Sequence, residues 1–256
     1  MEQKTDIHYN SEFYDIKSFK EGQSSLKPVE LELLGDITGK SVLHLQCHFG
    51  MDTISLSRLG AKVTGIDLSN NAIDKAKALA SELNMDTEFI QSDVYALKEN
   101  LEQKYDIVFT SYGVIGWLPD MDKWAHIISY FLKPGGKFIM VEFHPVVWMF
   151  SYDFKSIEFN YFGGEPIIEE LEGTYTDTEE KSNIKEKSVS WNHSLSEVFN
   201  ALQVNYLTLN SFKEYDYSAY NCFEQMIEID KDKYQIKGTD GKIPMMYSVV
   251  YEKLQD

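Results

Sequence analysis

The chain has 256 residues, of which 41 are acidic and 24 basic, so its formal net charge is −17. Hydrophobic residues make up 43% and charged residues 25%, which is ordinary for a globular protein, and the length allows one or two domains with a buried core. The acidic excess and the single arginine, Arg58, disfavour binding through phosphates, so we expect neither a nucleic acid nor an anionic membrane as partner.

The first residues, MEQKTDIHYNSEFYD, are polar and of mixed charge, unlike a secretory signal. The longest apolar runs, at 138–141 and 146–150, are far shorter than the roughly 20 residues that span a bilayer. Cys47 and Cys222 lie too far apart in sequence to suggest a disulfide framework. We therefore expect a soluble cytoplasmic protein.

Residues 41–143 alternate between strand and helix patterns. Strands are expected at 41–46, 61–67, 87–92, 105–111 and 137–143. Helices are expected over 52–59, 72–83 and 122–132, where apolar side chains recur on one helical face; Gly60 ends the first and Lys133 to Gly136 end the last. Strands separated by single helices form right-handed βαβ units, so we expect a doubly wound α/β fold with helices on both faces of a mostly parallel sheet.

The rest of the chain departs from this alternation. Residues 151–193 hold short aromatic and β-prone pieces, 194–202 predicts a helix, and 204–209 and 245–253 predict two further strands. No repeat or linker divides the chain. We predict one domain over 1–256, with a cofactor-binding core at 41–143 and substrate-lid insertions at 151–193 and 210–244.

Ligands of such sheets bind where parallel strands end. Gly50 lies in the turn after the first strand, where a glycine lets the backbone approach a ligand, although plain turn geometry also explains it. Asp67 ends the second strand, where an acid can accept hydrogen bonds from a ribose diol; a helix cap formed with Ser69 is the alternative. Asp93 follows the third strand and can accept from a purine amine, or be a solvated loop residue.

Five runs, VLHLQCHFGMDT, GAKVTGIDLS, FIQSDV, YDIVFTS and LKPGGKFIMVE, resemble the class I S-adenosylmethionine-dependent methyltransferases across 41–143. The resemblance implies a Rossmann-like, seven-stranded, mostly parallel sheet with one antiparallel strand near the C-terminus, and S-adenosylmethionine as cofactor. The cofactor-binding residues that it implies follow strands one to four: Gln46, His48, Gly50, Asp67, Leu68, Asp93, Val94, Ser111 and Tyr112.

The first motif departs from the family pattern D/E-x-G-x-G-x-G. His44, Gln46 and His48 replace the acid and two glycines, and only Gly50 remains. The usual acid helps hold the ammonium of the cofactor, which His44 cannot do as an anion; the amide oxygen of Gln46 or backbone carbonyls can substitute. The cluster of His44, Cys47 and His48 lacks the spacing of a zinc ligand set, so no metal is expected.

Methyl transfer from a sulfonium needs a positioned, desolvated nucleophile, and a base only where that nucleophile carries a proton of high pKa. Candidate bases are Tyr112, Glu142, His144 and His193; packing or a fixed turn is the structural alternative for the tyrosine and the two histidines. Of these, His144, after the fifth strand, and Tyr112 are the predicted catalytic residues. Residues 151–256 hold 20 acidic and 10 basic residues and many aromatics, which predicts a small cationic or aromatic acceptor.

The expected function is methyl transfer from S-adenosylmethionine to an oxygen or nitrogen of a small molecule. A non-catalytic module that binds the cofactor or a nucleoside is the alternative, because the first motif is altered. A nicotinamide-dependent oxidoreductase is less favoured, since it would need G-x-G-x-x-G where C-H-F-G-M-D stands.

Overall fold

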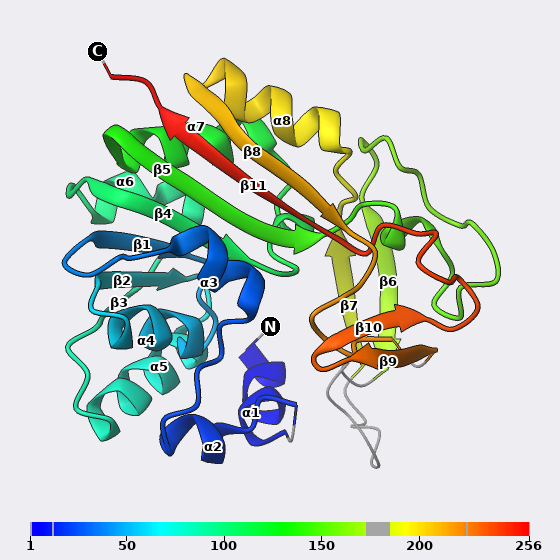
Figure 1. The fold of residues 1–256 in the computed structure, drawn as a ribbon, viewed down its shortest axis with the longest axis horizontal. Helices are drawn as coiled ribbons and strands as arrows, with labels where there is room; N and C mark the ends of the chain where they lie inside the picture. Colours follow the sequence, from blue (N-terminus) through cyan, green and yellow to red (C-terminus); the bar gives the residue numbers. More distant parts are fainter. Residues whose placement is uncertain (1, 12, 173–184, 224, 256) are drawn as a thin grey trace.

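A computed structural model describes residues 2–11, 13–172, 185–223 and 225–255. Its main sheet has seven strands in the order β3-β2-β1-β4-β5-β11-β8 (Figure 1). β11 pairs antiparallel with both β5 and β8, whereas β3, β2, β1, β4 and β5 are parallel to one another. This order confirms the predicted sheet. The strands are β1 (Ser41–Leu45), β2 (Lys62–Asp67), β3 (Glu88–Gln91), β4 (Tyr105–Ser111), β5 (Leu132–Phe143), β8 (Leu207–Tyr215) and β11 (Met246–Lys253).

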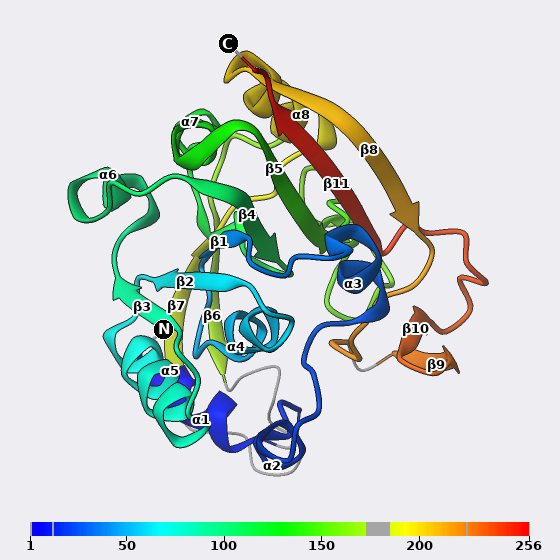
Figure 2. The ribbon, with the colours of Figure 1, turned by 60° about the vertical axis from the view of Figure 1, so that its left-hand side comes forward.

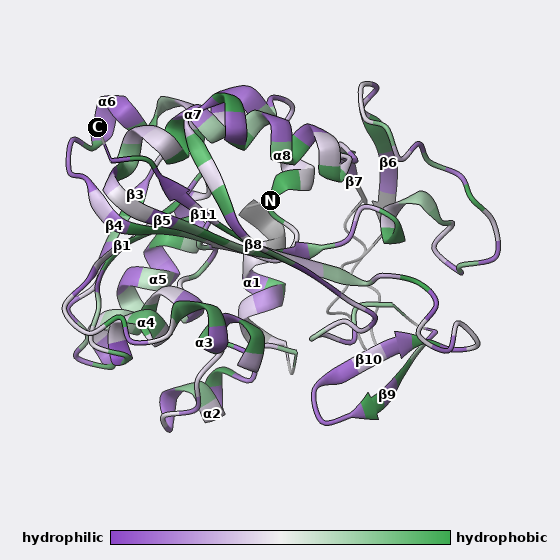
Figure 3. Cartoon of the chain, turned by 45° about the horizontal axis from the view of Figure 1, so that its top comes forward, coloured by the Kyte–Doolittle hydropathy of each residue, from purple (hydrophilic) through white to green (hydrophobic). Residues whose placement is uncertain are grey.

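Helices cover both faces of the sheet (Figure 3). One face carries α3 (Pro28–Leu34), α4 (Met51–Arg58) and α5 (Asn70–Glu82), and the other carries α6 (Leu97–Asn100), α7 (Met121–Phe131) and α8 (Leu195–Val204). Each of α5, α7 and α8 begins at a side-chain cap, formed by Ser69, Asp120 and Ser194 respectively, which accepts a backbone N–H of the first turn. The apolar side of each helix packs on buried strands, so the sheet is covered on both faces.

The sheet extends further than the sequence pattern predicts. β8 runs to Tyr215 instead of ending near residue 209, because β11 offers it backbone pairs as far as Met246 opposite Tyr215. Residues 210–215 therefore belong to the sheet. β5 also begins earlier than expected, at Leu132, and includes the Lys133 to Gly136 turn.

The two expected insertions each form a small antiparallel pair of strands. β6 (Ile167–Glu172) pairs with β7 (Lys185–Ser190), and β9 (Met226–Asp230) pairs with β10 (Lys233–Ile236). Both pairs lie beyond the end toward which β5 points (Figure 1). Residues 173–184, within the predicted insertion 151–193, lie outside the described residues.

Three helices that the periodicity did not predict precede the sheet: α1 (Glu2–Asn10), α2 (Ile16–Lys20) and α3. α1 packs against α5 and α3 against β5 (Figure 2). Short 3-10 turns follow three strands: η1 (Val94–Ala96), η2 (Ile115–Trp117) and η3 (Val147–Met149). Across the described ranges, we find no helix with the length and apolar character needed to cross a bilayer.

Candidate functional site

The turn between β1 and α4 has an unusual backbone conformation. Gln46, His48 and Gly50 all have positive φ, at 55°, 51° and 81°. These are the positions where the resembled motif has its glycines, so the left-handed conformation persists although two side chains now occupy it. At Gly50 no side chain fits, because a Cβ would lie 2.6 Å from the Phe89 ring and 2.9 Å from the Cβ of Ala76.

Asp67 lies at the end of β2 beside this turn. Its Oδ2 accepts from the backbone N–H of His48 at 2.8 Å, and its Oδ1 accepts from that of Ser69 at 2.9 Å. The α5 cap is formed by Ser69 itself, whose hydroxyl accepts from Ala72. Each carboxylate oxygen can accept more than one hydrogen bond, so an acid at the end of β2 is chemically suited to a diol.

The end of β3 carries the next predicted residues. Asp93 begins η1, and its carboxylate accepts from the N–H of Tyr95 at 2.9 Å. The side chain of Val94 is buried in the core, whereas Leu68, next to Asp67, is 53% exposed.

Gln46 has one satisfied and one unsatisfied polar atom. Its Nε2 donates to the carbonyl of Val114 at 2.9 Å, while its Oε1 is buried without a hydrogen-bond partner among the described residues. The neighbouring His44 faces Thr53, with 2.8 Å between Nδ1 and Oγ1, and burial lowers the pKa of His44 to about 4. At neutral pH His44 is therefore uncharged, and the orphaned carbonyl of Gln46 is an acceptor left for a ligand.

His48 turns its ring toward the N-terminal segment. The ring lies 4.2 Å from that of Phe49, 5.4 Å from that of His8 and 5.7 Å from that of Tyr14, measured between centroids. Burial, and then the charge of His8, lower the pKa of His48 to about 3. The contribution of His48 toward the strand ends is thus its backbone N–H, which orients Asp67.

The end of β4 brings the predicted residue Ser111 into contact with Asp52, which sequence reasoning missed. The hydroxyl of Ser111 donates to Oδ2 of Asp52 at 3.0 Å, and the hydroxyl of Ser25 donates to Oδ1 of the same side chain at 2.6 Å. Asp52 stands in the quoted first motif, two residues after Gly50, where an acid in the first turn of a helix is easily interpreted as favouring the helix alone.

Tyr112 and Glu30 form a buried pair next to Ser111. Tyr112 has a φ of 37°, a strained value for a residue other than glycine. Glu30, in the short helix α3, is fully buried, and in the described structure neither its carboxyl oxygens nor the Tyr112 hydroxyl has a hydrogen bond of normal geometry. Burial, and then the charge of Asp52, raise the pKa of Glu30 to about 8, while burial and Glu30 hold that of Tyr112 well above its usual range. No sequence pattern distinguishes Glu30 from an exposed helical glutamate.

Two of the remaining candidate bases are engaged in holding loops. Glu142 is buried and accepts from the backbone N–H groups of Gly113, Val114, Ile115 and Phe143, which shapes the loop after Tyr112. His144 accepts at Nδ1 from the N–H of Val146 at 3.2 Å and donates from Nε2 to Glu214 at 3.0 Å. These contacts favour a structural role for His144 over the predicted base, which nevertheless stays a prediction.

His193, the remaining candidate base, is also buried. Its Nε2 donates to the carbonyl of Leu118 at 2.8 Å.

Aromatic side chains from three parts of the chain, Phe13, Tyr112 and Tyr220, are linked through the ring of Tyr220. Tyr220, from the second insertion, meets the Tyr112 ring edge-on at 4.9 Å, and Phe13 stacks on Tyr220 at 5.7 Å. Lys27 places its Nζ 4.9 Å from the centre of the Tyr220 ring. The N-terminal segment, the β4 end and the second insertion therefore meet at one place.

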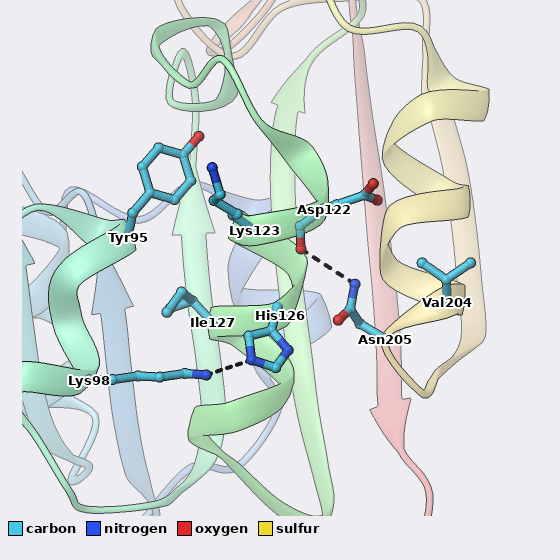
Figure 4. A pocket seen from close by; sticks show the side chains of 8 residues that line it. All are labelled: Tyr95, Lys98, Asp122, Lys123, His126, Ile127, Val204 and Asn205. Carbon is cyan, nitrogen blue, oxygen red and sulfur yellow. Dashed lines mark hydrogen bonds between the residues drawn. The ribbon is translucent and has the colours of Figure 1, made fainter.

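A surface hollow of about 370 Å³ lies elsewhere, between α6, α7 and the end of α8 (Figure 4). Lys98 and His126 face one another in it, and the side chain of Asn205 donates to the carbonyl of Asp122. None of the predicted cofactor-binding residues lines it. Among the described residues no group of three or more histidine, cysteine, aspartate or glutamate side chains is arranged to hold a metal ion.

Comparisons with known proteins agree with this geometry. Residues 42–136 match a family described as "Methyltransferase domain". Ubiquinone biosynthesis O-methyltransferases of Photorhabdus laumondii and Salmonella typhi are each 30% identical to the chain, over 130 and 131 residues, or 49% and 50% of it. The chain spans about half the length of these curated relatives, 54% of each.

Solved structures share the fold at low sequence identity. A putative S-adenosylmethionine-dependent methyltransferase from Listeria monocytogenes is 20% identical, with a TM-score of 0.64 over 89% of this chain and 96% of the other. An S-adenosylmethionine-dependent methyltransferase from Clostridium acetobutylicum is 15% identical, with a TM-score of 0.60 over 98% and 95%. The strand order, the acids at successive strand ends and the methyltransferase-domain match over 42–136 make this chain similar to the class I S-adenosylmethionine-dependent methyltransferases.

Proposed function

We propose that this chain transfers a methyl group from S-adenosylmethionine to an oxygen or nitrogen of a small molecule. The observation that carries the proposal is the series of polar groups at the ends of neighbouring strands: Asp93 after β3, Asp67 on β2 and the orphaned Gln46 oxygen after β1. An adenine, a ribose and a methionyl group joined in that order would meet these three groups in the same order.

Each predicted residue has a proposed task in this arrangement. Asp67 would accept from the ribose hydroxyls, held in place by the N–H groups of the Gly50 turn and of Ser69. Asp93, Leu68 and Val94 would flank the adenine. Gln46 and Ser111 would line the methionyl group, because they end the adjacent strands β1 and β4.

The acceptor side of the site is proposed at Tyr112. The bound cofactor supplies an activated methyl group, so the chain mainly has to position the nucleophile and keep water out. Because the raised pKa of Tyr112 keeps its phenol protonated, Tyr112 would donate a hydrogen bond to the acceptor, beside Glu30, whose pKa of about 8 keeps that carboxyl group largely protonated at neutral pH. The names of the relatives, which are O-methyltransferases, support an oxygen nucleophile.

A cationic or aromatic acceptor remains part of the proposal. The ring faces of Tyr220 and Tyr217 already hold Lys27 and Lys233, at 4.9 and 5.2 Å. A cationic acceptor would therefore meet the carboxyl groups near Tyr112 instead of these rings. The insertions containing β6–β7 and β9–β10 would cover the acceptor as lids, which their place beyond the end of β5 supports.

Titration calorimetry with S-adenosylmethionine and with its demethylated product tests the proposal. We expect both to bind the wild type, and Asp67→Asn to weaken binding at least roughly tenfold, because charged acceptors of diol hydrogen bonds contribute about 1.5–3 kcal/mol. The matched control is Asp74→Asn, which removes an exposed carboxylate from α5. Absence of binding by the wild type would reject the proposal.

A turnover screen then separates an enzyme from a binding module. Labelled S-adenosylmethionine is offered with panels of small phenols, carboxylic acids and amines, and transfer of label to one class is expected. Cofactor binding without transfer across the whole panel would favour the module.

A further inference from the structure

We infer that the Asp52 carboxylate binds the methionyl ammonium of the cofactor, in place of the acid that is missing from β1. The inference rests on the proposed function, since it assumes S-adenosylmethionine as ligand. It concerns a residue outside the set of positions that the family resemblance implies.

The strand order places Asp52 near the methionyl end. Asp93 and Asp67 mark β3 and β2, so the rest of an extended cofactor lies over β1 and β4, the next strands in the sheet. Asp52 is in the first turn of α4, directly after the β1 turn, and its Oδ2 is bonded to Ser111 at the end of β4. Neighbouring strands lie about 4.8 Å apart, so β4 is roughly 10 Å from β2, a span suited to the remainder of the cofactor.

The charges around Asp52 leave room for a cation. His44, at the usual position of the acid, is neutral because of its burial, and Glu30 is kept largely protonated below pH 8. Throughout the part of the chain that the structure describes, no lysine or arginine forms an ion pair with Asp52 or Glu30. Asp52 is partly buried, where a carboxylate attracts an opposite charge more strongly than it does in bulk water, so an ammonium ion at its oxygens would be favoured.

The hydrogen bonds of Asp52 also leave acceptor capacity. The hydroxyls of Ser25 and Ser111 each take one lone pair, one on each oxygen, and a carboxylate has about four acceptor sites. These two donors fix the orientation of the side chain without neutralising it. Gln46 directly follows β1, the strand next to β4, and its buried Oε1, which has no hydrogen-bond partner within the described ranges, supplies a second acceptor for the same ammonium group.

The test compares two ligands that differ in the methionyl group. S-adenosylhomocysteine carries the ammonium, whereas 5′-methylthioadenosine has the same nucleoside and sulfur without the amino-acid end. Affinities of both are measured by calorimetry for the wild type, Asp52→Asn and the control Asp74→Asn. Circular dichroism and thermal unfolding show that each variant is folded; if Asp52→Asn is not, Asp52→Ser is used in its place.

We expect Asp52→Asn to weaken S-adenosylhomocysteine roughly 10- to 100-fold and to change 5′-methylthioadenosine less than about threefold, because only the first ligand loses a charged hydrogen bond. An equal loss for both ligands would assign Asp52 a structural role and overturn the inference, as would an unchanged affinity for S-adenosylhomocysteine. If the wild type binds neither ligand, the proposed function itself fails and the inference fails with it.

Discussion

The free energy of unfolding of Glu30→Gln, minus that of the wild type, should increase as the pH rises. Glu30 is fully buried, and its pKa is raised from 4.5 to about 8. Between these two values the unfolded chain has released the proton that the folded chain retains, so the wild type loses stability as the pH rises through this window. By linkage this loss is about 1 kcal/mol at pH 5 and about 4 kcal/mol at pH 8. Glutamine does not titrate, so the Glu30→Gln variant does not lose this stability.

Urea unfolding followed by circular dichroism at several pH values between 5 and 9 measures this difference. We expect the free energy of unfolding of Glu30→Gln, minus that of the wild type, to increase by about 3 kcal/mol from pH 5 to pH 8. Any constant cost of burying the amide cancels in the comparison between pH values. Glu32→Gln, an exposed change in the same helix, should give a difference that varies by less than about 0.5 kcal/mol. A flat difference for Glu30→Gln would refute the reasoning.

Three further substitutions test the supports of the site. Gly50→Ala should lower the free energy of unfolding by about 2–4 kcal/mol, because its Cβ would strike the Phe89 ring at a positive φ; an unchanged thermal midpoint would contradict this. Glu142→Gln should lower the free energy of unfolding in urea by about 2–3 kcal/mol, because an amide cannot accept four backbone hydrogen bonds as a carboxylate does. A loss below about 0.5 kcal/mol, which is the usual range for surface substitutions, would argue against this. His144→Gln should lower stability by about 1–2 kcal/mol and change turnover of an acceptor found in the screen less than about threefold, whereas a loss of 10² or more would establish His144 as the base.

The sequence by itself determined the sheet and the strand ends at which the predicted cofactor-binding residues lie. Alternating strand and helix patterns over 41–143 predict the parallel strands, because helices on both faces bury most of the central strands β1, β2 and β4 and so favour short runs rich in apolar residues there. Once the strands are placed, Asp67 and Asp93 must lie at one edge, since parallel strands end on the same side. These are local patterns combined with one rule of topology.

Tertiary structure alone decided what surrounds Tyr112, the proposed acceptor side. α3 is too short for a periodic signal, and only packing against β5 shows that Glu30 is buried beside Tyr112. Asp52 looks like an ordinary residue of a first helical turn until Ser25 and Ser111 are seen on its two oxygens. His144, at the expected edge, has its ring nitrogens directed to Val146 and Glu214. Contacts between segments distant in the chain set the burial, charge and hydrogen bonds of these groups, and the spacing of residues along a sequence does not encode them.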